Sequence, residues 1–60
     1  MPLPEGAQIN EHGQLYISYP YCTWSPGDGD AVLDGDFSAE ELRAIADHMD
    51  TWNSRRLAKT

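Results

Sequence analysis

Residues 37–52 constrain the fold of this chain most, because they predict one amphipathic helix. Ser38 is a favourable N-cap residue and Glu41 follows three positions later, so the two side chains can form a capping box. Phe37 and Leu42 have the spacing of a hydrophobic staple, which would fix how the chain enters the helix. Apolar residues then recur at helical intervals and predict one buried stripe, formed by Leu42, Ile45, Ala46, Met49 and Trp52.

The other side of this helix is predicted to face solvent, and it includes His48. Acidic residues precede the first turn and basic residues follow the last one, as the helix macrodipole favours. We expect the helix to fray between residues 53 and 56, and residues 54–60 to form a frayed basic tail.

Three segments before the helix predict β-strands, at residues 7–10, 14–24 and 31–33. The longest of them alternates in character, and one set of its side chains is expected to face the helix, namely Leu15, Ile17, Tyr19 and Tyr21. Pro20 lies within this segment and has no N–H group for a ladder hydrogen bond. The strand must therefore be bulged or unpaired at Pro20, or break in two near residues 20–22.

The predicted fold is α+β, with a three-stranded antiparallel meander followed by one C-terminal amphipathic helix that packs on one face of the sheet (β-β-β-α). The 60 residues form a single small domain, with residues 1–6 as an extended lead-in. A domain of this size buries only about 60% of the surface that its unfolded chain exposes. A deep catalytic cleft is therefore not expected, and self-association into a homodimer stays open as a source of stability.

The net charge of −6 is unevenly distributed along the chain. Residues 28–50 contain eight acids and one base, Arg43, which gives this segment a net charge of −7. Direct binding of nucleic acid needs clustered Lys and Arg and is disfavoured, so a basic protein partner is favoured instead. The candidate partner-binding acids are Asp28, Asp30, Asp34, Asp36, Glu40, Asp47 and Asp50.

These acids could imitate the phosphates of a nucleic acid. The helix from Glu40 to Asp50 spans about 15 Å at 1.5 Å per residue. A DNA strand places one phosphate roughly every 3.4 Å over that length, so the acids of the loops at residues 28–36 would have to contribute. Ordinary solubility is the alternative explanation of the net charge.

No catalytic, metal-binding or cofactor-binding residue is predicted. The Asp-Gly-Asp triplets at residues 28–30 and 34–36 lack the glycine and glutamate that an EF-hand needs at positions 6 and 12. Neither His12 nor His48 has a second ligand at metal spacing, and Cys22 is expected to be a small buried or half-buried residue. A minimal enzyme or metal protein is the weakest reading of the chain.

The sequence contains no segment typical of a signal peptide and no apolar run of the roughly 20 residues that a bilayer span needs. With a single cysteine it also lacks an intramolecular disulfide. We therefore expect a cytoplasmic protein without membrane contact.

Aromatic residues concentrate in the segment before the loops, where Tyr16, Tyr21 and Trp24 are candidate interface residues. One strand cannot bury both of its faces under a single helix, so some of Tyr16, Pro20, Cys22 and Trp24 should be exposed or lie in an interface. Exposed Tyr and Trp side chains are common anchors in protein interfaces. Self-association, partner binding and simple exposure remain alternatives for this face.

The segment Val-Leu-Asp-Gly-Asp-Phe-Ser-Ala-Glu-Glu-Leu-Arg-Ala-Ile-Ala-Asp, at residues 32–47, resembles the small orphan proteins encoded in phages and prophages of proteobacteria. Together with the length, the acidity and the preceding aromatic strand, it is similar to small acidic anti-CRISPR proteins that inhibit type I systems, with type I-C as the narrower expectation. The resemblance covers about a third of the chain in wording.

The resemblance implies a stoichiometric inhibitor without catalytic activity. Such a protein would act in the cytoplasm of the bacterial host and bind the basic groove in which the Cascade surveillance complex receives target DNA. The alternative function is a small homodimeric accessory or interaction protein that uses the exposed aromatic face of its strand as an interface; for the protein in general, both a monomer and a homodimer stay open.

Overall fold

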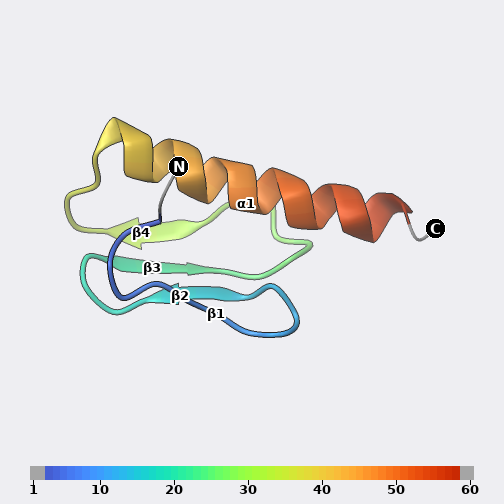
Figure 1. The fold of residues 1–60 in the computed structure, drawn as a ribbon, viewed down its shortest axis with the longest axis horizontal. Coiled ribbons are helices and arrows are strands. Elements are labelled where there is room, and N and C mark those ends of the chain that lie inside the picture. Colours follow the sequence, from blue (N-terminus) through green and yellow to red (C-terminus); the bar gives the residue numbers. More distant parts are fainter. Residues whose placement is uncertain (1–2, 59–60) are drawn as a thin grey trace.

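The computed structural model of the chain describes residues 3–58, with the backbone alone for residues 56–58. Four strands form one antiparallel sheet in the order β1-β2-β3-β4, and a single helix follows them (Figure 1). The elements are β1 Gln8–Ile9, β2 Leu15–Ile17, β3 Tyr21–Trp24, β4 Val32–Asp34 and α1 Ala39–Ala58. The predicted α+β class is confirmed, with four strands in place of three.

The additional strand arises at Pro20, where the predicted long strand breaks in two. Residues 18–20 form the turn between β2 and β3, and the Tyr19–Pro20 peptide bond is cis. Ile17 lies opposite Cys22, and Leu15 lies opposite Trp24. Breaking in two was one of the three outcomes that the missing N–H group of Pro20 allowed.

This turn also changes which residues of β3 face the helix. Residues directly opposite each other in an antiparallel pair point to the same face, so Cys22 and Trp24 join Leu15 and Ile17 in the core. The prediction that Tyr19 and Tyr21 face the helix is wrong. Both are exposed, because the turn restarts the alternation one position out of phase with β2.

The core lies between the sheet and α1. Its buried residues are Leu15, Ile17, Cys22, Trp24 and Ile45, with partly buried side chains packed around them, including Leu3, Ala7 and Phe37. The N-terminal segment contributes through a turn rather than an extended lead-in. The Ala7 N–H group donates to the Pro4 carbonyl oxygen at 3.1 Å, and Gly6 provides the positive φ of 88° that this turn requires.

The first turn of α1 has the capping box that the sequence predicts. The Glu41 N–H group donates to Ser38 Oγ at 3.1 Å, and the Ser38 N–H group donates to Glu41 Oε1 at 2.8 Å. This reciprocal pair satisfies two backbone donors that the helix start would otherwise leave free.

The buried stripe of α1 is turned by about one residue from its predicted position. Ala44 and Ile45 are buried, whereas Leu42 is 43% exposed and Ala46 is also exposed. Half-buried side chains complete the stripe, namely Glu41, His48, Met49, Trp52 and Asn53. The prediction that His48 lies on the solvent side is therefore wrong.

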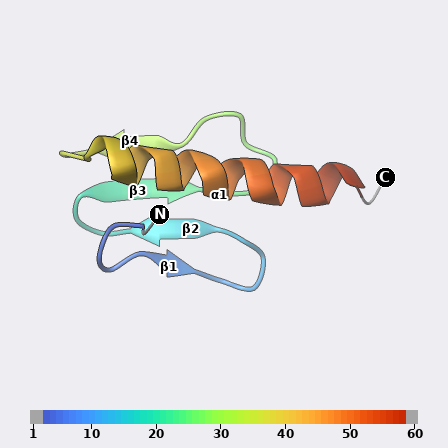
Figure 2. The same cartoon turned by 45° about the horizontal axis from the view of Figure 1, so that its top comes forward.

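The helix continues through residues 53–56, where the sequence predicts fraying, and ends at Ala58. Residues 59–60 of the predicted basic tail lie outside the described residues. A helix of 20 residues is about 30 Å long, far longer than strands of two to four residues. Its C-terminal part therefore extends beyond the sheet (Figures 1 and 2).

Two loops at one end of the sheet contact the middle and the second half of α1. His48 Nε2 donates to the carbonyl oxygen of Gly13, in the β1–β2 turn, at 2.8 Å. The N–H group of Gly27, in the β3–β4 loop, donates to Asn53 Oδ1 at 3.0 Å. Trp52 lies so close to Gly13 that a Cβ atom on this glycine would overlap the indole ring. Side chains from the middle and the second half of α1 thus contact both loops.

Candidate partner-binding surfaces

The seven acids predicted to bind a partner are all exposed in the structure. Asp28 and Asp30 lie in the β3–β4 loop, Asp34 ends β4, and Asp36 precedes α1. The other three, Glu40, Asp47 and Asp50, lie on the helix itself. Among the described side chains, no Lys or Arg forms a salt bridge with any of them. The carboxylates are therefore not neutralised within the described part of the molecule.

Three of the acids form a row on the helix, which we call the helix row: Glu40, Asp47 and Asp50. With Arg43 they are spaced by three, four and three residues, which places all four side chains on one side of a helix. This side is opposite to the buried stripe, so the row points away from the sheet. Arg43 lies within the row, so the four side chains together have a net charge of −2.

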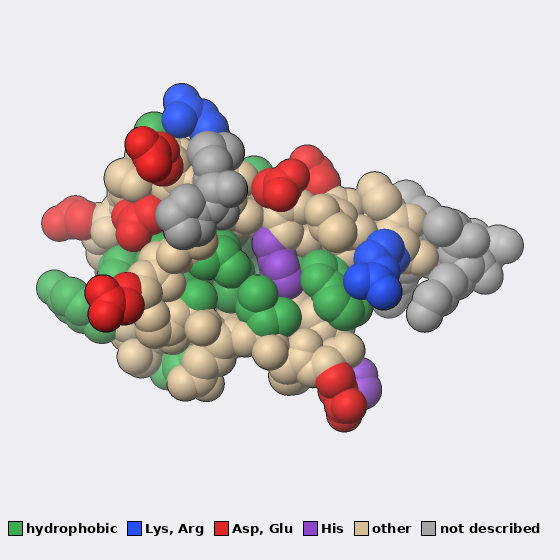
Figure 3. All heavy atoms as spheres, viewed as in Figure 1, with side chains coloured by type: hydrophobic (Ala, Val, Ile, Leu, Met, Phe, Trp, Pro, Cys, Tyr) green, Lys and Arg blue, Asp and Glu red, His purple; other side chains and the backbone are tan. Residues whose placement is uncertain are grey.

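The structure does not bring all seven acids onto one surface. Asp34 lies opposite Tyr21 in the sheet register, on the face that points away from the helix. The helix row lies on the other side of the molecule. On the face drawn in Figure 3, acidic side chains occupy separate places around the edge, and hydrophobic side chains lie in the centre.

The second candidate surface is the sheet face that α1 does not cover, which we call the open face. One cross-strand row runs over it through Gln8, Tyr16, Thr23 and Val32, and Tyr21 and Asp34 form the next pair. Tyr16 is 45% exposed and Val32 is 56% exposed. The rings of Tyr16 and Tyr21 meet edge to face, with their centroids 6.1 Å apart at an angle of 83°. Two of the three predicted interface aromatics therefore lie together on this face.

Trp24, the third predicted interface aromatic, is a core residue. It is 2% exposed, and its Nε1–H group donates to the Asp28 carbonyl oxygen at 3.1 Å. Its ring meets the His48 ring edge to face at 5.5 Å. Trp24 is therefore not accessible as an interface residue, because the turn at Pro20 moves it to the helix side of the sheet. The proline was the sequence signal for that change of phase.

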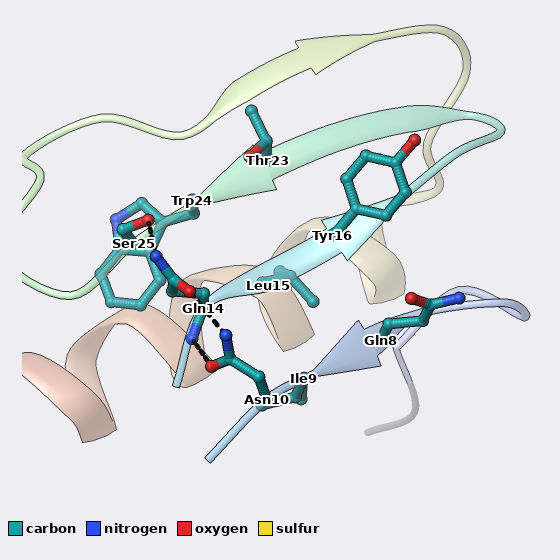
Figure 4. Close-up of a pocket in the computed structure, with 9 residues that line it drawn as sticks. All are labelled: Gln8, Ile9, Asn10, Gln14, Leu15, Tyr16, Thr23, Trp24 and Ser25. Carbon is teal, nitrogen blue, oxygen red and sulfur yellow. Dashed lines mark hydrogen bonds between the residues drawn. The ribbon is translucent and has the colours of Figure 1, made fainter. Parts of the chain in front are cut away.

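The open face is hollowed at one end, with a cavity volume of about 400 Å³ that opens widely to solvent (Figure 4). Tyr16 and Thr23 rise from the sheet beside it, while Leu15 points to the opposite side. Polar side chains close its far end, where Gln14 Nε2 donates to Ser25 Oγ at 3.3 Å. The hollow offers amide and hydroxyl groups next to an aromatic ring.

One free cysteine, Cys22, lies among the described residues. Cys22 is fully buried, and desolvation by burial raises the pKa of its thiol, which disfavours the reactive thiolate. No three His, Cys, Asp or Glu side chains within residues 3–58 are grouped as metal ligands would be. His48 serves the fold through its bond to Gly13.

Comparisons with known protein families, with curated proteins and with solved structures found no match for this chain. Within the described residues, α1 is the one helix, and it is not apolar enough to cross a lipid bilayer.

Proposed function

We propose that this protein is a non-catalytic inhibitor that binds a basic protein surface through its exposed acids. The observation that carries the proposal is the exposure of seven acids without a salt bridge to any described Lys or Arg. Carboxylates that form no internal salt bridge keep their field available to a partner. A basic surface is therefore attracted to them, and no salt bridge to a described Lys or Arg has to break when it binds.

The specific partner that we propose is the Cascade complex of a type I CRISPR system, with type I-C as the narrower candidate. The protein would act as an anti-CRISPR protein of phage origin in the bacterial cytoplasm and imitate DNA in the groove that receives the target. Support comes from the sequence resemblance of residues 32–47 and from the charge of residues 28–50. Because the acids lie on different sides, the helix row is the part best suited to follow a line of phosphates.

The test measures binding to purified type I Cascade at several salt concentrations, with target DNA as competitor. We compare two variants that each change the net charge from −6 to −4, namely D47N/D50N on the helix row and E5Q/E11Q away from it. The first is expected to weaken binding by roughly threefold to tenfold, and the second by less than about twofold. Reversal of Glu40, Asp47 and Asp50 to Lys should abolish binding.

Equal losses in the two matched variants would show that only net charge matters and would contradict a helix-row interface. Retained inhibition of Cascade after the triple reversal would contradict the proposal that the acids imitate DNA. Absence of binding by the unaltered protein, at low salt and high concentration, would overturn Cascade as the partner.

A second candidate function is a small homodimeric accessory protein that associates through the open face. The exposure of Tyr16, Tyr21 and Val32 on one uncovered sheet face favours it. Size-exclusion chromatography with light scattering on the unaltered chain and on Y16A separates the two functions. A dimer that Y16A dissociates would support the accessory protein, and a monomer at all concentrations would contradict it.

A further inference from the structure

We infer that the open face binds an arginine side chain of a protein partner, with Tyr16, Tyr21 and Asp34 as its recognition site. This inference rests on the proposed function only in taking the partner to be a basic protein. It assigns a second contact, on the side of the molecule opposite to the helix row.

The aromatic part of the site is the tyrosine pair. Tyr16 is 45% exposed and Tyr21 is 37% exposed, so both rings keep surface in contact with solvent. An edge-to-face pair leaves ring faces at which a flat cation can stack. A guanidinium group within about 6 Å of a tyrosine centroid is attracted by the ring quadrupole.

The acidic part of the site is Asp34, which lies directly opposite Tyr21 in the β3–β4 register. Opposite residues in an antiparallel pair have Cβ atoms about 4.5–5.5 Å apart and point to the same face. A guanidinium group that stacks on Tyr21 therefore has a carboxylate within reach. The planar fork of arginine can stack and donate hydrogen bonds at once, which the ammonium group of lysine cannot match.

No Lys or Arg side chain of the described residues occupies this site. Asp34 is exposed and forms no salt bridge with a described Lys or Arg. Arg55 lies over the Trp52 ring, 4.7 Å from its centroid, and Arg43 lies on the outward side of α1. Both are on the helix, across the sheet from Asp34. The Arg55–Trp52 contact shows in this same chain the stacking that we assign to the open face.

Charge complementarity favours a cationic partner over a second copy of the chain. A symmetric dimer through the open face would bring two Asp34 carboxylates into one interface without a described cation beside them. Two chains of net charge −6 would also repel each other. An arginine neutralises the carboxylate and covers the tyrosine rings together.

The experiment titrates the ¹⁵N-labelled protein with three short peptides that differ only in a central arginine, lysine or citrulline. Citrulline keeps the flat shape of arginine but lacks the charge. We expect the arginine peptide to shift the amide signals of Tyr16, Tyr21 and Asp34, with affinity on the order of millimolar. The lysine peptide should bind more weakly, and the citrulline peptide should cause no comparable shift.

Two variants test the site itself. D34N keeps the size of an exposed side chain, so it should fold, and it should weaken arginine binding by about threefold or more. Y19A removes an 87% exposed tyrosine at the neighbouring turn and should leave the affinity unchanged. Dispersed amide spectra confirm that both variants are folded.

Equal shifts with arginine and citrulline, shifts confined to α1, or an unchanged affinity in D34N would overturn the inference. A dimer that shields Tyr16 and Tyr21 from the peptide would overturn it as well. These outcomes leave the Cascade measurement unaffected, and a failure to bind Cascade leaves the peptide titration unaffected, so the two proposals can fail separately.

Discussion

The Nε2–H group of His48 donates a hydrogen bond to the carbonyl oxygen of Gly13, 35 residues earlier in the chain, at 2.8 Å. Gly13 is buried, so its carbonyl group has restricted access to water. The bond supplies a partner to that group and ties the β1–β2 turn to the middle of α1. Trp52 covers the same glycine one helical turn further on.

Replacement of Gly13 by alanine should destabilise the fold strongly. Gly13 has a φ of 83°, and an added Cβ atom would overlap the Trp52 indole. Backbone strain and overpacking together should lower the free energy of unfolding by about 2–4 kcal/mol. Urea unfolding followed by circular dichroism measures the change.

Two other glycines provide matched controls for this substitution. Gly6 has a φ of 88° with open space around it, so G6A should lower the free energy of unfolding by only about 1 kcal/mol. Gly29 has neither a positive φ nor a close neighbour, and G29A should change the free energy of unfolding by less than about 0.5 kcal/mol. A G13A variant as stable as G29A would show that Trp52 can move away without loss.

Replacement of His48 by phenylalanine should lower the free energy of unfolding by about 1–3 kcal/mol. Phenylalanine keeps a ring beside Trp24 and Trp52 but removes the donor to Gly13, which leaves a buried carbonyl group unpaired. H12F is the control, because the His12 side chain is exposed and lies beside the exposed carboxylate of Glu11. A similar stability of H48F and H12F in urea would contradict a structural role of the Gly13 bond.

The capping box predicts a coupled loss in two single variants. S38A and E41A should each lower the free energy of unfolding by about 1 kcal/mol, since each removes one acceptor of the reciprocal pair. S54A, an exposed serine later in the helix, is the control. The double variant should lose less than the sum of the two single losses, and strict additivity in thermal and urea unfolding would show that the two bonds act independently.

Burial of Cys22 predicts a decline in stability at high pH. Burial raises the pKa of its thiol above its ordinary value of 9.0, so the folded protein keeps a proton that the unfolded chain releases as the pH rises above 9. The stabilisation is thus fully present below pH 9 and is lost as the pH rises through the higher, folded pKa.

The measurement compares unfolding of the unaltered chain and C22A between pH 8 and pH 10. The variant should show a shallower decline, whatever its stability at pH 8. Labelling of the thiol by a disulfide reagent should also be slow in the folded state and accelerate in urea. Rapid labelling without urea would show that Cys22 is accessible.

The features predicted correctly from the sequence depend on residues close together in the chain. The capping box joins Ser38 to Glu41, and an irregularity near residues 20–22 follows from the missing N–H group of Pro20. Both consequences are local, so no knowledge of distant contacts is needed. The exposure of Tyr16 follows likewise from the alternation along β2.

The features that the sequence did not reveal depend on distant contacts or on turn geometry. Trp24 joins the core because the β2–β3 turn restarts the alternation, and the sequence left open whether Pro20 made a bulge or a turn. His48 is drawn to the buried side of α1 by the Gly13 carbonyl, which pairs with it from another element. Hydrophobicity alone assigned that place to Leu42 and so misplaced the stripe.

The two hydrogen bonds between α1 and the loops, His48 to Gly13 and Gly27 to Asn53, bear on when the chain can fold. They connect residues separated by 26 and 35 positions, so the sheet cannot complete its core before the helix has been synthesised. Contacts of long sequence separation slow folding, because a long loop must close before they form. The protein should therefore become ordered in one late step, when the helix emerges from the ribosome and closes over strands made earlier.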